Sequence, residues 1–280
     1  MRKIAVIGAG TLSGRELVKI LEGYNCSVLP LSCGALTREE EFGDLVIFEP
    51  QASLLEDIEL VILMETLAVP ELLTDFSGYI LDFRIDADPS IEFVPLTGIW
   101  PKGAKKMRAR PVLEQVLTII PKLVKSVGDI SGTHLQSVAY LGDRGVEGLM
   151  EQTVAILRGE SPDFGKLGYQ GAFEIVPCVP RGRMIQVRVP AFHGDLLILH
   201  LRAVDGQYLC CAEEFQIGVE WREHPPTSRE VAVSANLLAH IYFINDGREA
   251  ILTIGFDPIL WWILRPVLVL LGISCNGVIE

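Results

Sequence analysis

The first sixteen residues, MRKIAVIGAGTLSGRE, constrain the fold of this chain more than any other stretch. The apolar run 4–7 predicts a short buried strand, and apolar residues at helical spacing over 17–21 predict a helix after it. Between the two stand Gly8, Gly10 and Gly14, with the spacing GxGxxxG. This spacing is a weak signal alone and a stronger one between a strand and a helix. The segment therefore predicts a strand, a tight turn and a helix.

This turn is suited to binding a nucleotide. Glycine lets the backbone approach a pyrophosphate closely, and the helix N-terminus supplies amide donors and the positive end of a dipole. The predicted cofactor-binding residues are Gly8, Gly10, Thr11, Leu12 and Gly14. The alternative is a glycine turn that only packs the helix on the strand.

Strands and helices alternate over residues 1–110. Strands are predicted at 27–31, 44–48, 60–64 and 79–82, with a helix over 69–76. Short apolar strands that alternate with helices indicate a doubly wound parallel sheet, an α/β fold with its ligand at the carboxyl ends of the strands. A dinucleotide site also calls for an acidic residue at the end of the second strand. That strand is followed by Ser32 and Cys33, and Arg38 is the nearest charged alternative.

Residues 111–257 have the pattern of a second, α+β domain with a mostly antiparallel sheet. The apolar spacing predicts a long helix over 111–127, a strand at 134–141 and a helix over 146–159. Several strands then follow closely, at 172–176, 184–190, 196–203, 209–215, 237–245 and 250–255.

Composition excludes several classes of function. The chain has 280 residues and a net charge of −12, so it repels nucleic acid. The basic segment 102–110 is better explained as a solvated loop than as an anion site. None of the six cysteines has CxxC spacing, which argues against a zinc site or a disulfide framework, and no metal is expected. Free thiols and an N-terminal apolar run too short for a signal peptide predict a cytoplasmic protein.

Four strings, in order along nearly the whole chain, resemble the aspartate-semialdehyde dehydrogenase family: IAVIGAGTLSGRELVKILE, LDFRIDADPSIEFVPLTG, SVAYLGDRGVEGLMEQT and MIQVRVPAFHGD. The resemblance implies a Rossmann-like NAD(P)-binding domain over 1–110 and a dimerisation domain over 111–257. It also implies that 258–280 packs back on the first domain. A homodimer that binds NADP or NAD, connected with amino-acid biosynthesis, is the corresponding expectation.

The residues that carry that family's chemistry are absent. The family's cysteine nucleophile is matched by Leu113, and its acid–base histidine by Asp195, with His193 on the other side of Gly194. Its inner-strand glutamine is matched by Cys178. Its basic C-terminal stretch is matched by Asp257–Trp262, in which both basic residues are gone. Because an activated nucleophile is essential to such acyl chemistry, the resemblance implies a pseudoenzyme.

Two arginines remain from the family's anion-binding set. Arg84 is similar to its phosphate-binding arginine, and it either binds an anion or pairs with Asp82 or Asp86. Arg188 is similar to its substrate-carboxylate arginine, and its charge in an apolar strand needs a partner, for which Glu174 is a candidate.

Two weak catalytic candidates remain among the other residues. Cys178 is the best alternative nucleophile, although a buried inert thiol is the favoured interpretation. His193 and Asp195 suggest an acid–base dyad, but no serine partner is evident from the sequence. The apolar run 259–271 is too short to span a membrane, and burial is favoured over a membrane-surface contact.

Three functions stay open. The first is a non-catalytic, nucleotide-binding homologue or subunit. The second is an NAD(P)-dependent oxidoreductase with different chemistry. The third is a dimeric interaction protein without cofactor, which pairs with an active paralogue or contacts a membrane through 259–271.

Overall fold

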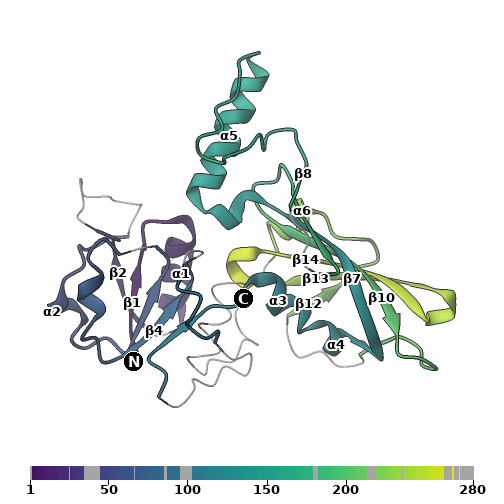
Figure 1. Cartoon of the computed structure of the whole chain (residues 1–280), viewed down its shortest axis with the longest axis horizontal. Coiled ribbons are helices and arrows are strands. Elements are labelled where there is room, and N and C mark those ends of the chain that lie inside the picture. The colour runs from purple at the N-terminus through teal and green to yellow at the C-terminus, as the bar shows by residue number, and fades with distance from the viewer. Residues whose placement is uncertain are drawn as a thin grey trace. The chain divides into compact units, whose positions relative to one another are not determined.

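The computed structural model describes residues 2–24, 26–34, 45–65, 67–84, 87–94, 103–178, 182–212, 218–234, 236–261, 267 and 271. The chain forms two compact units (Figure 1). The first comprises Met1–Arg110 with Trp262–Ile273, and the second comprises Pro111–Trp261 with Ser274–Glu280.

The first unit is built on a five-stranded parallel sheet with the strand order β2-β1-β3-β4-β5. Its strands are β1 (Lys3–Ile7), β2 (Ser27–Leu31), β3 (Leu60–Leu63), β4 (Tyr79–Asp82) and β5 (Lys106–Arg108). The chain steps from β1 to β2 on one side and to β3 on the other, so the strand order reverses beside β1. The predicted doubly wound parallel sheet is thereby confirmed.

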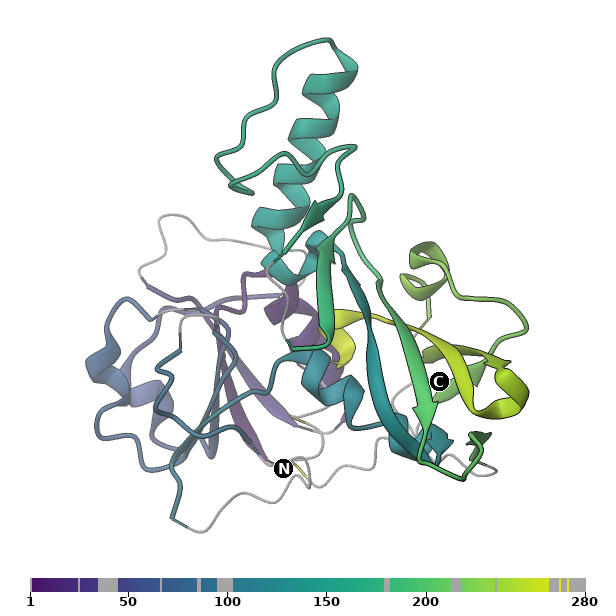
Figure 2. The ribbon, with the colours of Figure 1, turned by 45° about the vertical axis from the view of Figure 1, so that its right-hand side comes forward.

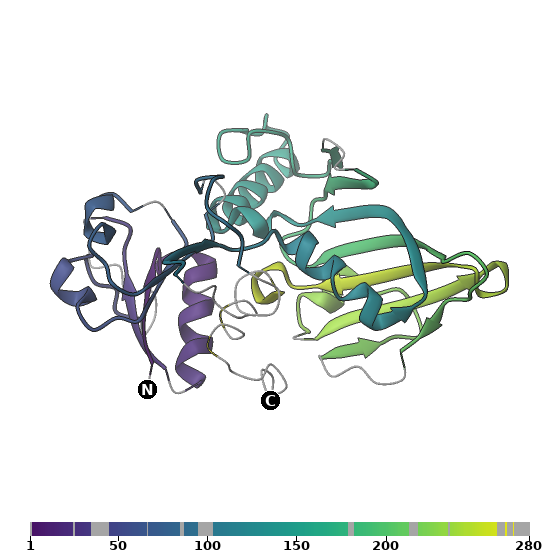
Figure 3. The same ribbon diagram turned by 60° about the horizontal axis from the view of Figure 1, so that its bottom comes forward.

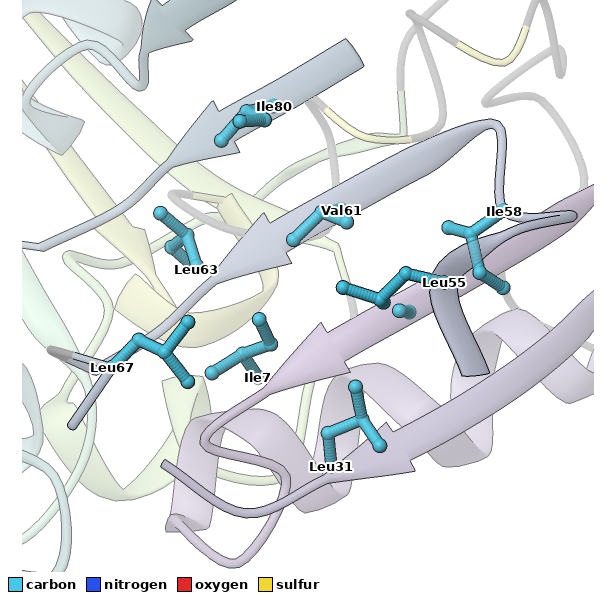
Figure 4. Close-up of a cluster of buried hydrophobic side chains, with 9 residues drawn as sticks. Ile7, Leu31, Leu55, Ile58, Val61, Leu63, Leu67 and Ile80 are labelled. Carbon is cyan, nitrogen blue, oxygen red and sulfur yellow. The ribbon is translucent and has the colours of Figure 1, made fainter. Parts of the chain in front are cut away.

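Both faces of this sheet are buried, which explains the unbroken apolar run of β1. Helix α1 (Leu12–Gly23) buries Leu17, Val18 and Leu21. A separate core cluster, drawn in Figure 4, joins alternate residues of the strands to α2 (Ala52–Leu55) and η1 (Pro70–Leu73).

Two predicted elements of this unit are shorter than expected. The strand predicted at 44–48 is reduced, within the described residues 45–48, to isolated bridge residues at 45 and 48, of which Phe48 pairs with Leu31. Phe48 donates to the carbonyl of Pro30, but proline has no amide with which to continue the ladder. The helix predicted over 69–76 is only the single 3₁₀ turn η1, because the chain returns within a few residues to begin β4.

The second unit contains a seven-stranded sheet with the order β12-β13-β14-β10-β7-β9-β8. The strands are β7 (Val127–Gln136), β8 (Val176–Pro177), β9 (Met184–Arg188), β10 (Asp195–Ala203), β12 (Val219–Trp221), β13 (Leu237–Ile244) and β14 (Glu249–Phe256). Four of its six pairings are antiparallel, which confirms the predicted sheet class. A small separate ladder pairs β6 (Val124–Lys125) with β11 (Cys210–Cys211).

The long helix predicted over 111–127 is wrong. The segment forms α3 (Val112–Leu117), α4 (Ile120–Leu123) and then β6, and it runs along one face of the seven-stranded sheet (Figure 3). The reason is Pro121, which cannot donate to the preceding turn and so ends one helix where the next begins. The strand predicted at 134–141 is also placed too late in the chain. The observed strand ends at Gln136, and η2 (Val138–Leu141) follows it.

Helix α5 (Asp143–Leu157) stands out from the sheet, and the chain after it returns alongside the helix (Figure 2). The buried amide of Gln152 ties the two together. Its Nε2 donates to the carbonyls of Asp163 and Tyr169 at 3.0 and 2.9 Å, and its Oε1 accepts from the amides of Gly171 and Ala172. The amides of Gly171 and Ala172 are therefore bonded to a side chain and not to a neighbouring strand. Of the strand predicted at 172–176, only Val176 lies in a strand, at the start of β8.

The remaining elements are short. They are α6 (Ser228–Val231) and η3 (Asn245–Gly247). The strand predicted at 209–215 is limited to β11 among its described residues, and 213–217 lie outside them. Of the apolar run 259–271, the residues Ile259, Trp261, Val267 and Leu271 are buried, and 262–266 and 268–270 lie outside the described residues. Over the described ranges, the helices are too short or too polar to cross a bilayer.

Candidate functional site

The glycine turn follows β1 at the carboxyl edge of the five-stranded sheet. Gly8 has a φ of +86°, a conformation that side-chain-bearing residues rarely adopt. The amides of Gly8 and Ala9 donate to the carbonyl of Leu31 at 2.9 and 3.0 Å. The turn is therefore attached to the end of β2, directly beside the point where the strand order reverses.

Gly14 lets helix α1 lie against this turn. A Cβ atom at this position would lie 2.3 Å from the carbonyl oxygen of Gly8 and 2.9 Å from the Cα of Ala9. Both contacts are with backbone, which has no flexible end to move aside. The third glycine of the motif is thus required by packing.

Thr11 caps the helix. Its hydroxyl accepts from the amide of Gly14 at 3.0 Å and donates to the carbonyl of Gly8 at 2.8 Å. The guanidinium of Arg15 donates to the carbonyl of Gly10. By contrast, the amides of Gly10 and Ser13 donate to no other residue within the described part of the chain. The turn thus combines donors for an anion with a cation one helical turn away.

The surroundings of the turn are less suited to a dinucleotide. Glu65 follows β3, and its Cβ and Cγ lie 3.2 Å from where a side chain on Gly8 would begin. Glu65 thus brings an acidic side chain next to Gly8. At the end of β2, the hydroxyl of Ser32 donates to the carbonyls of Phe48 and Gly34, and Arg38 lies outside the described residues.

Arg84 is paired rather than presented to a ligand. Its Nε and Nη2 donate to the two carboxylate oxygens of Asp82 at 2.8 and 2.7 Å, and Lys106 Nζ lies 3.3 Å from the same carboxylate. Burial acts to raise the pKa of Asp82, but the hydrogen bonds from Arg84 and the charge of Lys106 outweigh it and leave that pKa below its ordinary value. Of the alternatives raised by the sequence, pairing with Asp82 is observed, and Asp86 lies outside the described residues.

Arg188 is placed between two aromatic rings. Its guanidinium carbon lies 4.8 Å from the ring centre of Tyr169 and 5.6 Å from that of Tyr140. These cation–π contacts stabilise the charge of Arg188. The expected ion pair with Glu174, which is exposed, is not formed. Its Nε is buried and has no acceptor in the described part of the chain, and the buried hydroxyl of Tyr169 has no partner there with good geometry.

The environment of this cluster favours neutral phenols. Burial is the main cause that raises the pKa of Tyr140, and the nearby Tyr169 adds to it. Burial likewise raises the pKa of Tyr169, although the charge of Arg188 opposes this. Gln152 positions Tyr169 through its backbone carbonyl. Neither tyrosine carries a local sequence signal, because η2, the loop after α5 and β9 come together only in the folded unit.

Cys178 lies at the edge of the same cluster. Its amide donates to the carbonyl of Gln186 at 2.8 Å, and in the β8–β9 ladder it stands on the same side as Arg188. Its thiol is half-buried, and its sulfur lies 3.9 Å from the carbonyl oxygen of Val176. Cys178 therefore lies on the Arg188 side of this ladder.

Asp195 belongs to a buried network that the sequence did not reveal. One carboxylate oxygen lies 2.8 Å from His134 Nε2, and the other accepts from the amide and hydroxyl of Ser137 at 2.9 and 2.7 Å. All three residues are almost fully buried, and the His134 ring stacks on Phe256. Asp195 thus has both a histidine and a serine partner, contrary to the expectation, but they join β7, η2 and β10 inside the unit.

His193 takes no part in that network. It is half-buried beside Asp257, whose pKa is raised by burial despite the opposing effects of two backbone amides and of His193. Asp257 accepts from the amides of Ile259 and Leu260, which caps the turn that follows it. The acid–base dyad suggested for His193 and Asp195 is therefore not formed. Asp195 bonds to His134, and His193 lies beside Asp257.

Leu113 lies in the first turn of α3, directly after Pro111 and Val112. The helix begins where the sequence placed it, but this position holds no nucleophile. No group of three or more potential metal ligands gathers among the described residues.

Comparison with solved structures gives full-length matches at low identity. A probable aspartate-semialdehyde dehydrogenase from Pseudomonas aeruginosa has a TM-score of 0.73 and 19% identity, covering 96% of this chain and 97% of its own. Aspartate semialdehyde dehydrogenase II from Vibrio cholerae has a TM-score of 0.75 and 13% identity, covering 97% and 98%. The chain has the fold of the aspartate-semialdehyde dehydrogenases. The enzyme from Francisella tularensis gives the same result, with a TM-score of 0.71, 14% identity and 98% and 100% coverage.

The similarity to the semialdehyde dehydrogenase fold thus extends over nearly the whole chain. No family model and no curated protein matches its sequence.

Proposed function

We propose that the chain is a nucleotide-binding protein with the semialdehyde dehydrogenase fold, that NADP or NAD binds at its glycine turn, and that it lacks cysteine-dependent dehydrogenase activity. The observation that carries this proposal is the turn itself. Gly8 has a positive φ, Gly14 has no room for a Cβ, and the amides of Gly10 and Ser13 are available to an anion.

The residues of the turn fit the diphosphate of such a cofactor. Gly8, Gly10, Thr11, Leu12 and Gly14 would form the turn around it, and the amides of Gly10 and Ser13 would be its donors at the helix start. A nicotinamide cofactor supplies hydride transfer when it is bound. The chain's own contribution is binding and orientation, since Leu113 supplies no thiol for a covalent intermediate.

An oxidoreductase with different chemistry is the second candidate, and the cluster around Arg188 favours it. A buried guanidinium Nε without an acceptor is suited to a carboxylate or phosphate. Cys178 and Arg84 are secondary here, since the thiol of the first contacts only a backbone carbonyl among the interactions of the described residues and the second is occupied by Asp82.

We further propose that the protein is a homodimer and that the open face of the seven-stranded sheet is its interface. Ile185, Ile198 and Tyr242 are 47%, 40% and 65% exposed and point to the same side of β9, β10 and β13. Exposed apolar sheet faces of this kind mark association surfaces.

Ile198→Glu is expected to shift the sedimentation of the protein from twice the chain mass to the chain mass, whereas Thr118→Glu on an exposed position of the same unit leaves it unchanged. A monomeric unmodified protein would contradict this proposal, and a mixed species with an active paralogue would replace it with a heterodimer.

Calorimetric titration with NADPH and with NADH tests the nucleotide site. Saturable binding is expected, and Gly10→Asp is expected to weaken it at least about tenfold, because a carboxylate would face the diphosphate. Gly23→Asp is the matched control, since it makes the same change at the other end of α1, where a Cβ would meet nothing within 4 Å.

The same titration examines Glu65. Removing its charge by Glu65→Gln is expected to tighten binding by roughly threefold to tenfold, because one like charge beside Gly8 is lost. Glu56→Gln, on an exposed turn of the same unit, serves as its control. Absence of binding at millimolar cofactor in every variant would leave a structural or partner-binding protein, and affinity unchanged by both Gly10→Asp and Glu65→Gln would place the site elsewhere.

A further inference from the structure

Helix α5 carries apolar side chains on two faces. The first face is buried against the chain that returns after the helix, and its buried residues are Gly145, Gly148, Leu149 and Gln152. The second face holds Met150, Val154 and Leu157, which follow the i, i+4, i+7 spacing of a single stripe. At 3.6 residues per turn, this stripe lies on nearly the opposite side of the helix from the buried face.

The second stripe is exposed to solvent. Met150, Val154 and Leu157 are 53%, 41% and 74% exposed. A surface helix usually has one apolar stripe, which faces the core, and polar residues on its other side. In α5 the side away from the core is also apolar at its centre, which indicates an association surface.

Charged residues of opposite sign border the exposed stripe near its two ends. Glu147 stands three residues before Met150, and Arg158 directly follows Leu157. The two charged residues are eleven positions apart, which is close to three helical turns, so they lie on the same side of the stripe. Their separation along the helix axis is about 16 Å, which prevents them from pairing within one helix.

Both charges are accessible to another molecule. Arg158 is exposed and forms no ion pair within the described part of the chain. Glu147 Oε2 lies 2.9 Å from Lys166 Nζ, but the same ammonium lies 2.6 Å from Glu151 Oε1. Lys166 therefore keeps a partner when Glu147 turns to another cation, and exposed pairs of this kind contribute little to stability.

We propose that α5 is a self-association surface, on which α5 of a second copy of this chain packs antiparallel about a two-fold axis. Such an axis requires a patch that is complementary to itself. The midpoint between Glu147 and Arg158 falls within half a residue of the midpoint between Met150 and Val154. One antiparallel register therefore packs Met150 on Val154 of the second copy and places Glu147 beside its Arg158, twice in each contact.

This contact is expected to be weak and separate from the open sheet face. The 15 residues of α5 offer a strip about 22 Å long and about 10 Å wide. A standard interface buries roughly 800 Å² on each partner, which is more than this strip supplies. The contact therefore adds a concentration-dependent step to whatever assembly the sheet face forms, and it depends neither on that assembly nor on a nucleotide.

Sedimentation velocity of the full chain between about 1 and 200 μM, the range of a weak contact, tests the proposal. The mass is expected to double over this range, in the unmodified protein and also in Ile198→Glu, in which the sheet face carries a charge. Met150→Glu is expected to weaken this step at least about tenfold, because it places a carboxylate in the apolar stripe. Val233→Glu is the matched control, since it makes an apolar-to-glutamate change at a residue of the same unit that is 87% exposed.

Charge reversal tests whether the partner is a second copy. Glu147→Arg and Arg158→Glu are each expected to weaken the step by about threefold to tenfold, because like charges then meet at two places. The double variant is expected to return to within about twofold of the unmodified protein. Because these residues cannot meet within one helix, such recovery requires a second copy.

Three results would overturn the proposal. They are a mass that stays constant over the whole range, which would leave the stripe to a different protein, an equal step in Met150→Glu and Val233→Glu, and a double variant that associates as weakly as its single variants. Thermal unfolding of each variant separates a loss of association from misfolding.

Discussion

Replacing Asp195 by alanine is expected to lower the free energy of unfolding by about 3–5 kcal/mol, because three hydrogen bonds to a buried carboxyl group are lost together. The substitution leaves the amide and hydroxyl of Ser137 and the Nε2 of His134 without an acceptor inside the protein. Because these groups join η2, β7 and β10, the loss is expected to spread through the second unit.

Asp195→Asn is expected to be milder, at about 1–3 kcal/mol, because one amide oxygen replaces two carboxylate oxygens. Chemical denaturation followed by tryptophan fluorescence measures both variants. The exposed Asp205→Ala of the same unit is the control and is expected to change stability by less than about 0.5 kcal/mol. A loss below about 1 kcal/mol for Asp195→Ala would mean that the network contributes little to the fold.

Gly14→Ala is expected to destabilise the first unit by about 1–3 kcal/mol or more, because overpacking against backbone forces the helix to move. The Cβ would approach Gly8 O to 2.3 Å, whereas at Gly23 it would meet nothing within 4 Å. Gly23→Ala in the same helix is therefore expected to be neutral or to stabilise by up to about 1 kcal/mol.

Hydrogen exchange of the amides in β1 and α1 measures this pair of variants. Faster exchange is expected in both elements for Gly14→Ala and unchanged or slower exchange for Gly23→Ala. Nucleotide affinity is expected to fall with Gly14→Ala alone, since the turn moves with the helix. Equal protection in the two variants would contradict the close packing at Gly14.

Local patterns predicted the elements whose causes are local. The bounds of β2 and β4 follow from short apolar runs, and α5 and the strands β9, β10, β13 and β14 of the second unit were also predicted from the local pattern. The strand predicted at 134–141 overlaps β7 only at its last three residues. The helix predicted over 111–127 failed at Pro121, whose breaking effect competes with a continuous apolar stripe. The strand at 44–48 failed because its neighbour is Pro30.

The candidate site was predictable only in part for the same reason. The glycine turn and the pairing of Arg84 with Asp82 involve residues close in sequence. Asp195 and His134 are 61 residues apart, and the rings around Arg188 come from separate loops. Only the strand register brings such residues together.

The most direct measurement is a crystal structure of the protein grown with saturating NADPH. The account predicts the diphosphate at the glycine turn, within hydrogen-bonding distance of the amides of Gly10 and Ser13, and no covalent bond to any side chain. NADPH bound elsewhere on the chain, or an empty turn at saturating NADPH, would contradict it.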